Sequence, residues 1–364
     1  MEFLSEYGLF LLKTATIVIA IVIILSLIIS AGHRQRSTGR GEIKVTNLGD
    51  TVKEHSQAIQ NEVLSKAEFK LLLKQEKEQL KKEEKEQKQE LKKQKKPSVK
   101  SDSENAENEQ EQKSRLYVLD FDGDVEASAV ESLREEITAI LSTANKQDEV
   151  LLRLKSPGGM VHAYGLAASQ LKRIADAGHH FTIAVDEVAA SGGYMMACVA
   201  DKIVAAPFAI IGSIGVVAEI PNFNRLLKKA YVDYEQHTAG DYKRTLTLFG
   251  ENTTHGREKF KQELEETHQL FKAFINENRP KLDIDQVATG EHWYGRQALN
   301  LGLVDEIKTS DDLIVQAVET KDVYSVKYEI KRPLTDKLSI SLHGALDKLV
   351  LRWIQRSSQT NLFK

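Results

Sequence analysis

The sequence predicts an α/β fold with a parallel sheet, preceded by a membrane anchor and a charged stalk. The first observation behind this prediction is an alternation, beginning at Arg115, of short apolar runs with longer segments whose apolar residues have helical spacing. Such alternation favours parallel strands joined by crossover helices. The second observation is a change of composition, because the residues before Arg115 form an uncharged apolar stretch and then a Lys- and Glu-rich one.

The overall composition excludes some classes of protein. The chain has 364 residues, enough for a sizeable buried core, and a formal net charge of -3. A charge so close to balance gives no general attraction to nucleic acid, so we expect no nucleic-acid partner. Cys198 is the only cysteine, and therefore no intrachain disulfide can form. Its apolar neighbours indicate that Cys198 packs in the core.

Residues 1–32 are predicted to form a transmembrane anchor in contact with lipid. Thr14–Ala31 is an uncharged run of 18 residues, close to the ~20 that a helix needs to cross a bilayer. A cleaved signal peptide is the alternative, but acidic residues rather than a basic region precede the run. Under the positive-inside rule, the basic residues that follow would keep the rest of the chain in the cytoplasm. These residues are His33, Arg34, Arg36 and Arg40.

Residues 33–113 are predicted to be a helical or disordered stalk and linker. Between Lys81 and Lys96 there are eight lysines, four glutamates and one leucine. A segment of this composition cannot bury enough apolar surface to fold alone, although Glu–Lys pairs can support a solvated helix. Nucleic-acid binding is the less favoured alternative, because the acids are interleaved with the lysines. Pro97–Gln112 is polar and acidic, which is typical of a flexible linker.

Residues 114–330 are predicted to be the folded domain, with short apolar strands and amphipathic helices. The expected strands are Leu116–Phe121, Val150–Leu154, Phe181–Val185, Lys202–Ala206 and Val232–Glu235. The expected helices are Ala127–Leu141, Val161–Ala177, Met195–Ala200 and His255–Glu277. Residues 331–364 mix apolar and basic side chains and are expected to form an amphipathic tail, which packs on the domain, a partner or a membrane surface.

Two glycine-rich motifs follow expected strands and precede expected helices. In Ser156-Pro157-Gly158-Gly159, the glycines allow a close approach of the backbone to a ligand, and N–H groups at a helix start favour an anionic oxygen. In Ala190-Ser191-Gly192-Gly193, the serine hydroxyl would lie at the carboxyl edge of the sheet, which is the logic of a nucleophile elbow, although the G-x-S-x-G pattern is absent. The alternatives are a turn without a ligand for the first motif and a helix-capping serine for the second.

Two further motifs are less specific. Gly212-Ser213-Ile214-Gly215 places a serine between glycines in an apolar neighbourhood, and a plain turn is its alternative. Gly240-Asp241-Tyr242-Lys243 holds a lysine that would ordinarily be a surface residue. No metal or nucleotide-binding motif is visible, so no cofactor and no metal are expected.

In this order, the motifs SPGG, ASGGY, GSIG and GDYK resemble those of the signal peptide peptidase A family of serine proteases, in particular its short, single-repeat members. The similarity extends from the N-terminal anchor to about Ile307. The resemblance implies a Clp protease/crotonase-like fold, which is a spiral of ββα units. It also implies a membrane-anchored serine endopeptidase of the bacterial inner membrane that assembles as a homo-oligomer and hydrolyses peptides or proteins.

The resemblance assigns roles by position. Ser191 matches the nucleophile and Lys243 the general base, while Ser213 matches the serine that orients the lysine. The backbone N–H groups of Gly159 and Gly192 match the oxyanion hole. A lysine is a base at neutral pH only where burial disfavours its charged form, which the apolar residues around Ser213 would supply. In related enzymes the serine and the lysine can come from neighbouring protomers.

Other interpretations stay open at this point. Histidines that could complete a triad instead are His162, His179, His180, His237 and His255. A crotonase-like enzyme acting on acyl-CoA would share the fold and the oxyanion hole, and a non-catalytic membrane scaffold would share the anchor and the stalk. The family implies remnant signal peptides or misfolded membrane-associated proteins as substrates. It also implies the periplasm for the catalytic domain, whereas the basic residues after the anchor imply the cytoplasm.

Overall fold

The computed structural model describes residues 41–75 and 113–330, together with Lys13, Thr14, Thr16, Lys77, Glu78, Lys81 and Lys82. The predicted anchor over residues 1–32 falls almost wholly outside this part of the chain, as do most of the charged run, the linker and the tail over residues 331–364. Within the described residues, no helix combines the length and the apolar character needed to cross a bilayer. The compact unit that carries the fold extends from Ile43 to Tyr328.

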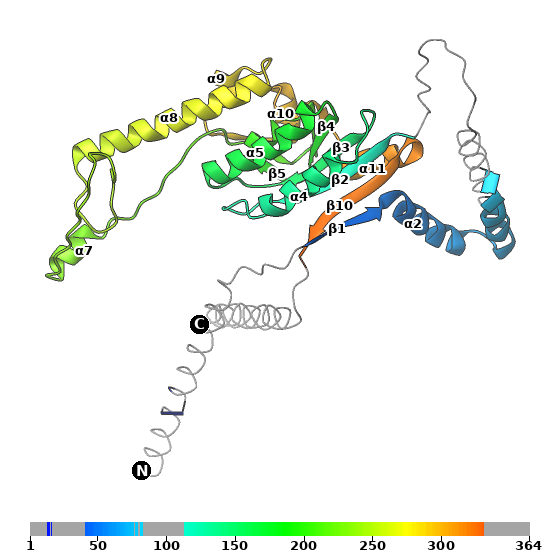
Figure 1. Ribbon diagram of the computed structural model, residues 1–364, viewed down its shortest axis with the longest axis horizontal. Helices are drawn as coiled ribbons and strands as arrows, with labels where there is room; N and C mark the ends of the chain where they lie inside the picture. Colours follow the sequence, from blue (N-terminus) through cyan, green and yellow to red (C-terminus); the bar gives the residue numbers. More distant parts are fainter. Residues whose placement is uncertain are drawn as a thin grey trace, which may run out of the picture. The chain divides into compact units, whose positions relative to one another are not determined.

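The main sheet has seven strands in the order β1-β10-β2-β3-β4-β6-β9 (Figure 1). Each neighbouring pair from β10 to β9 is parallel, which confirms the predicted parallel α/β sheet. The central strands β2, β3, β4 and β6 are rich in Leu, Val and Ile because both of their faces are largely buried, whereas β1 at the edge is mostly exposed. Their bounds are β1 Glu42–Asn47, β2 Arg115–Asp122, β3 Glu149–Lys155, β4 His180–Val185, β6 Lys202–Ala205, β9 Glu306–Ile307 and β10 Asp322–Glu329.

A second sheet of three short strands stands beside the main one and was not predicted. It contains β5 (Val188–Ala190), β7 (Ile210–Gly212) and β8 (His292–Tyr294). β5 and β7 are parallel, and β7 and β8 are antiparallel. Three residues are too few to show a period of two, so the sequence pattern could not identify these strands.

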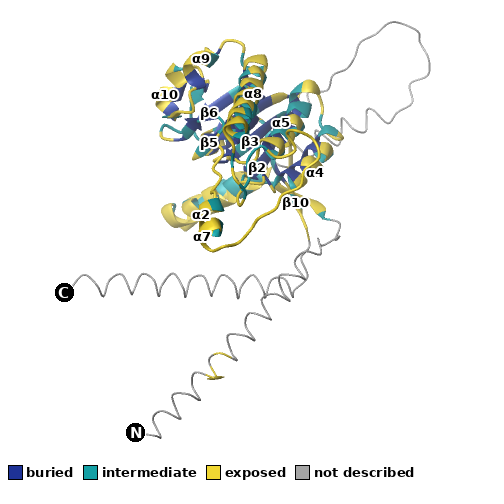
Figure 2. Cartoon of the chain, turned by 90° about the vertical axis from the view of Figure 1, so that its left-hand side faces the viewer, coloured by how far each residue is buried: buried dark blue, intermediate teal, exposed yellow. Residues whose placement is uncertain are grey.

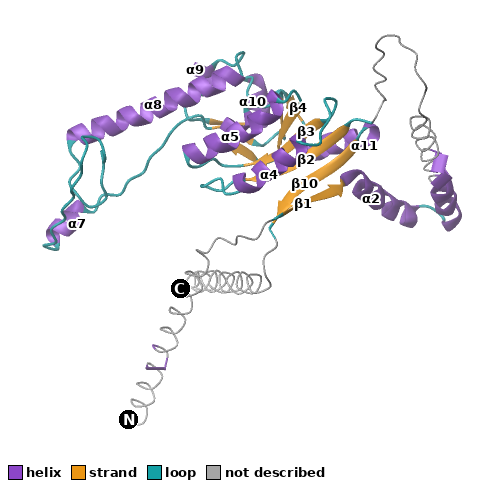
Figure 3. Ribbon diagram, viewed as in Figure 1, coloured by secondary structure: helices purple, strands orange, loops and turns teal. Residues whose placement is uncertain are grey.

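Helices cover both faces of the main sheet (Figure 3). On one face, α4 and α5 bury Leu133, Ile137 and Leu171 against strand residues of the larger core. On the other face, Ile314 of α11 packs with Val118 and other strand residues in a smaller core. Figure 2 shows the buried residues gathered on the strands and on the sides of the helices that meet them. The helices are α2 Leu48–Val63, α4 Val130–Leu141, α5 Val161–Asp176, α6 Gly192–Ala197, α7 Asn224–Lys229, α8 Thr254–Asn278, α9 Ile284–Val287, α10 Gly295–Asn300 and α11 Ser310–Thr320.

Residues 217–253, which we call the arm, connect the second sheet to α8. None of them is buried, and α7 is the only helix among them. Figure 1 shows the arm at the end of α8 that is remote from the sheet. The predicted strand Val232–Glu235 is wrong, because this segment lies in the arm without any neighbouring strand to satisfy its backbone hydrogen bonds.

Candidate active site

Ser191 occupies the junction between β5 and α6, where it is half-buried. Its backbone has φ 53° and ψ −117°, a conformation that L-residues rarely adopt. The conformation is held by two backbone hydrogen bonds: the N–H of Ser191 donates to the carbonyl of Gly212 at 2.7 Å, and the Ser191 carbonyl accepts from Met195 at 3.0 Å. The hydroxyl does not cap α6. The alternative of a helix-capping serine is therefore excluded, and the hydroxyl is left available for chemistry.

Ser213 lies at the corresponding position on the adjacent strand. In the parallel pair of β5 and β7, Ala190 is the partner of Gly212, so Ser191 and Ser213 each follow a paired residue. Ser213 also has a positive φ of 51°, and its N–H donates to the carbonyl of Glu291 at 2.7 Å. The structure thus brings these two predicted site residues together at one edge of the second sheet.

The Ser156-Pro157-Gly158-Gly159 loop packs directly against the loop of Ser191. A hydrogen-bonded bridge joins Ser156 to β5, with Ala190 N–H donating to the Ser156 carbonyl at 3.0 Å. Gly158 has φ 87°, and a Cβ atom there would lie 2.7 Å from the carbonyl oxygen of Ala190 and 2.8 Å from the nitrogen of Gly192. Only glycine permits this approach, which explains the residue type at this position of the motif.

Gly159, Ser191 and Gly192 line one small hollow of about 10 Å³, together with Val161, Met195, Gly215, Val216, Thr267 and Phe271. A volume near 10 Å³ accommodates about one water molecule. The backbone N–H groups of Gly159 and Gly192 donate to no acceptor in the part of the chain that the structure describes. An oxyanion hole requires such N–H donors without acceptors next to the nucleophile, and here they lie beside a serine hydroxyl that forms no helix-capping hydrogen bond.

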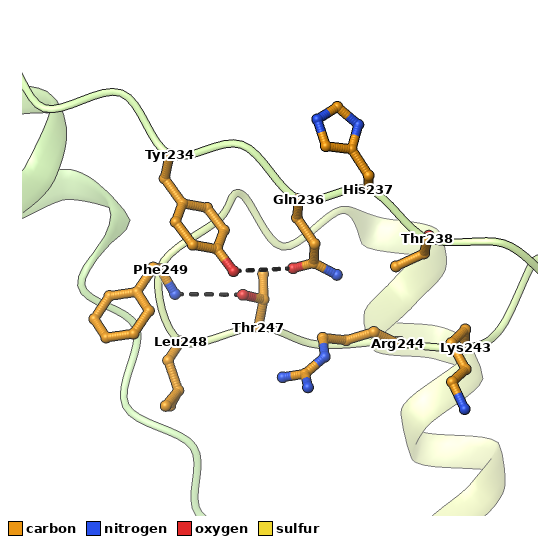
Figure 4. A pocket seen from close by; sticks show the side chains of 9 residues that line it. All are labelled: Tyr234, Gln236, His237, Thr238, Lys243, Arg244, Thr247, Leu248 and Phe249. Atoms are coloured by element: carbon orange, nitrogen blue, oxygen red, sulfur yellow. Dashed lines mark hydrogen bonds between the residues drawn. The ribbon is translucent and has the colours of Figure 1, made fainter.

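Lys243 lies elsewhere, in the arm. It is exposed and lines a different hollow of about 380 Å³, whose walls are formed by arm residues alone. Figure 4 shows this hollow, in which the backbone N–H of Phe249 donates to Thr247 and the Tyr234 hydroxyl donates to Gln236. The Lys243 amine forms no ion pair with any described residue. The structure therefore unites Ser191, Ser213, Gly159 and Gly192 within one chain, and leaves Lys243 outside the group.

The five candidate histidines do not line the hollow of Ser191. His179 is buried and its Nδ1 lies 3.3 Å from the carbonyl of Asp148, which is a structural contact. His180 faces Asp201 at 3.7 Å, and His237 lies in the arm near Glu235. His255 stacks obliquely with Tyr242, and His162 is exposed on α5. None of these placements forms a Ser–His pair.

Sequence analysis missed several residues around the site. Phe271 and Thr267 come from α8, about 80 residues beyond Ser191 in the chain, and complete the wall of the hollow. Tyr164 contacts both glycine loops from α5. In the sequence these residues lie within expected helices, and no local signal marked them as neighbours of the two glycine motifs.

Comparison with known proteins shows the family of the chain. The family model for the N-terminal part of peptidase family S49 matches residues 2–171, and the model for peptidase family S49 matches residues 173–324. The chain is 51% identical over 363 residues to the "Probable protease SohB" of Haemophilus influenzae, covering 100% of this chain and 99% of that one. It is 40% identical over 354 residues to the "Putative protease SohB" of Buchnera aphidicola subsp. Baizongia pistaciae, covering 97% and 99%.

Among solved structures, the chain is similar to a membrane-bound stomatin-specific protease, 1510-N, in complex with a substrate peptide. The TM-score is 0.39 with 15% identity, over 63% of this chain and 98% of that one, and so weak a likeness adds nothing to the assignment. The family matches span most of the sequence, and the full-length identity to the curated relatives is high. The chain therefore belongs to peptidase family S49, and it is a serine protease that acts on peptide substrates.

Proposed function

We propose that this protein is a membrane-anchored serine endopeptidase with a Ser–Lys dyad. Ser191 is the nucleophile, Lys243 is the general base, and Ser213 orients the lysine. The N–H groups of Gly159 and Gly192 bind the oxyanion. The observation that carries the proposal is the hollow lined by Ser191, Gly159 and Gly192. In it, a serine hydroxyl without a helix-capping hydrogen bond lies beside two N–H groups without acceptors.

The exposed position of Lys243 leads us to include a contact between protomers in the proposal. A lysine accepts a proton at neutral pH only if its surroundings disfavour the ammonium form, and water does not do so. Because the arm carries Lys243 away from the site of its own chain, we propose that the arm reaches the Ser191 hollow of a neighbouring protomer. Burial there would supply the desolvation that the general base needs.

The surface of the arm supports such an assembly. It exposes large apolar side chains at Val217, Leu226, Tyr231, Val232 and Phe249, with Tyr231 97% exposed. A monomeric soluble domain rarely keeps so many apolar groups on one segment in water. Contact with a second copy of the chain would bury them, and the homo-oligomer is part of the proposed function.

The proposed reaction assigns a step to each of these groups. Ser191 Oγ attacks the carbonyl carbon of the scissile peptide while Lys243 Nζ takes the hydroxyl proton. The tetrahedral oxyanion accepts hydrogen bonds from Gly159 and Gly192, which are stronger in the transition state than in the substrate complex. Lys243 returns the proton to the leaving amine. Water next attacks the acyl-enzyme, with Lys243 again as the base, and the product acid leaves Ser191.

We further propose that residues 1–32 anchor the enzyme in the bacterial inner membrane and that its substrates are peptides or misfolded proteins at that membrane. The support is the uncharged run Thr14–Ala31, whose length matches a bilayer. A fusion of alkaline phosphatase after Lys364 tests the side of the catalytic domain, because this reporter is active only outside the cytoplasm. Phosphatase activity would support the periplasmic side, and its absence with a stable fusion would support the cytoplasmic side.

Peptide hydrolysis by the detergent-solubilised full chain tests the dyad. Ser191→Ala and Lys243→Ala should each lower kcat by at least about 10⁴-fold, the usual effect of removing one member of a catalytic unit. Lys229→Ala is the matched control, because Lys229 is another exposed lysine of the arm, and it should keep wild-type kcat. A folded Lys243→Ala enzyme with wild-type kcat would remove the lysine from the mechanism, whereas hydrolysis surviving in Ser191→Ala would refute the serine.

A further inference from the structure

A buried chain of hydrogen bonds lies beneath the two glycine loops. The Tyr164 hydroxyl is 2.6 Å from Ser156 Oγ and 2.7 Å from the carbonyl oxygen of Asp124. Ser156 Oγ in turn accepts the N–H of Gly158 at 3.1 Å. Tyr164 and Ser156 are both 0% exposed. The bond between these two hydroxyl groups is therefore closed to water, whereas the bond to Asp124 is only partly buried.

The directions of the hydrogens follow from the chemistry of the four groups. A carbonyl oxygen only accepts, so the Tyr164 hydroxyl donates its single hydrogen to Asp124. The Ser156 hydroxyl must then donate to Tyr164 Oη, while its oxygen accepts from Gly158. Burial raises the pKa of Tyr164 above its usual value, which keeps the hydroxyl protonated. Each hydroxyl and N–H group in this chain of bonds donates to a partner, so the hydrogen bonds can run in only one direction.

The ring of Tyr164 makes a second contact, with the other glycine loop. A Cβ atom at Gly192 would lie 2.4 Å from Cγ of Tyr164, so the ring packs directly on the Gly192 backbone. Tyr164 sits in the first turn of α5, five residues after Gly159, and its N–H donates to the carbonyl of Met160 at 3.0 Å. One rigid side chain thus touches the segments that carry both unused N–H donors.

The bond to Asp124 fixes the outer side of the same loop. Next to Asp124, the carbonyl of Val125 accepts the N–H of Met160 at 2.8 Å. A Cβ atom at Gly159 would lie only 2.2 Å from this carbonyl oxygen. Gly159 is therefore held between the Val125 carbonyl on one side and the bonds of Ser156 and Tyr164 on the other.

We propose that Tyr164 is a positioning residue for the oxyanion hole, acting through Ser156 on the Gly159 loop and through its ring on Gly192. The inference rests on the proposed function, because it gives the two N–H groups their catalytic role. Hydrogen bonds to an oxyanion depend steeply on donor position, and a displacement of about 1 Å can cost about 10²-fold in rate. Tyr164 adds a side-chain connection between these two loops to their direct backbone bond from Ala190 to Ser156.

The test compares Tyr164→Phe with Tyr194→Phe in the full-length, detergent-solubilised protein. Tyr194 is a matched control: it is also 0% exposed, and its hydroxyl donates to the carbonyl of Leu303 at 3.0 Å, away from both loops. Tyr164→Phe leaves the ring in place and removes the bonds to Ser156 and Asp124. Its kcat should fall about 10- to 100-fold with KM changed less than about twofold, because the oxyanion exists only in the transition state.

Inhibition by a peptide aldehyde provides a second readout. The aldehyde forms a tetrahedral adduct with the serine, and its oxygen occupies the oxyanion hole, so its Ki in Tyr164→Phe should rise by about the factor by which kcat falls. Tyr194→Phe should lose comparable thermal stability and keep both wild-type kcat and wild-type Ki. Should Tyr164→Phe fail to fold, Ser156→Ala decides the matter, since it interrupts the same bonds with a smaller change and should show the same split between kcat and KM.

The outcomes separate the inference from the function beneath it. If the wild type hydrolyses peptides through Ser191 while folded Tyr164→Phe or Ser156→Ala keeps its kcat and its aldehyde Ki, the positioning role is overturned alone. Failure of both variants to fold, with Tyr194→Phe folded, would assign these residues to core stability and also overturn it. A folded wild type without hydrolysis that depends on Ser191 would overturn the proposed function, and the positioning role with it.

Discussion

At the scale of single residues, Ser191 and Ser213 share an unusual backbone. Both have φ near 50°, at the ends of two paired strands. A residue held in such a sparsely populated conformation costs about 1–3 kcal/mol and persists only where its surroundings impose it. At Ser191 the hydrogen bonds to Gly212 and Met195 impose it. In this conformation the Ser191 hydroxyl does not cap α6. The backbone at this position therefore lowers the stability of the fold while it keeps the hydroxyl available as a nucleophile.

The strained backbone at Ser191 predicts that glycine stabilises the protein more than alanine at this position. Ser191→Gly should be more stable than Ser191→Ala by about 1 kcal/mol, because glycine relieves the strain and alanine retains it. Ser169, which is exposed in the middle of α5, is the control. At this position Ser169→Ala should be more stable than Ser169→Gly by about 1 kcal/mol. Denaturant unfolding of the four variants measures both differences. The same order at both positions would show that the backbone at Ser191 is not strained.

Glu136 predicts a second effect, on the pH dependence of stability. Its side chain on α4 is 5% exposed; Oε1 accepts the N–H of Tyr328 at 2.7 Å, and Oε2 is buried with no partner among the described residues. Burial raises its pKa to about 7, and the nearby Asp120 acts in the same direction while Lys327 opposes it. The unfolded chain has the ordinary glutamate value, so the folded protein binds the proton more tightly.

The sign follows from this difference. The contribution of the protonated carboxyl is fully present below a pH of about 4.5 and is lost as the pH rises through about 7, a change of about 3 kcal/mol. Glu136→Gln should therefore match the wild type near pH 4.5 and exceed it in stability near pH 8. Thermal unfolding at both pH values measures the effect, with exposed Glu135→Gln as control. If the wild type were less stable than Glu136→Gln by the same amount at both pH values, the raised pKa of Glu136 would be contradicted.

The sequence predicted candidate residues of the site but could predict little of their arrangement. The motif order singled out Ser191, Ser213, Gly159 and Gly192; the structure places Ser191 and Ser213 at the ends of two paired strands and Gly159 and Gly192 beside Ser191 in one hollow. It could not identify Tyr164, because a tyrosine at a core position of an amphipathic helix has the same pattern whether or not its hydroxyl connects two loops. Which polar partner a buried hydroxyl meets is decided by packing between distant segments, and period and composition do not encode it.

At the scale of secondary-structure elements, the apolar runs at the centre of the main sheet were predicted best. The four central strands β2, β3, β4 and β6 and the long helices α5 and α8 were predicted closely; α5, for example, spans Val161–Asp176 against an expected Val161–Ala177. The remaining strands of the main sheet, β1, β9 and β10, and the helix α11 were not predicted. The three strands of the second sheet were not predicted, although β5 and β7 position both serines. The expected strand Val232–Glu235 was wrong for a related reason, because an apolar run forms a strand only where another strand pairs with it.

The glycine loop between β3 and α5 gives a prediction at this scale. Gly159→Ala should destabilise the protein by about 1–3 kcal/mol and lower kcat more than it raises KM, because its Cβ would lie 2.2 Å from the Val125 carbonyl oxygen and force the N–H donor to move. Gly165→Ala, six residues on in α5 and with open space around a Cβ, should be neutral or stabilising by up to about 1 kcal/mol. Equal kinetics for the two variants would show that the loop tolerates displacement.

At the scale of the whole molecule, the main feature is that a single chain does not bring all of the proposed catalytic groups together. Ser191, Ser213, Gly159 and Gly192 converge at the second sheet, whereas Lys243 lines a hollow made by the arm alone. The family resemblance implied that the serine and the lysine can come from neighbouring protomers, but residues 217–253 contain little regular structure from which the position of Lys243 could be inferred. If the arm acts on a neighbour, each active centre needs one protomer that supplies the serine and another that supplies the lysine.

This arrangement predicts complementation between two inactive variants. In a closed ring of head-to-tail contacts that mixes Ser191→Ala and Lys243→Ala protomers at random and equally, about one centre in four combines an intact serine with an intact lysine from its neighbour. Co-expression of the two variants should therefore restore about a quarter of wild-type kcat per protomer. Co-expression of Ser191→Ala with the double variant lacking both residues should restore none, because no protomer then carries the serine. A mixture that forms stable oligomers and stays inactive would show that Ser191 and Lys243 must belong to the same chain, so that the arm would have to fold back onto its own domain.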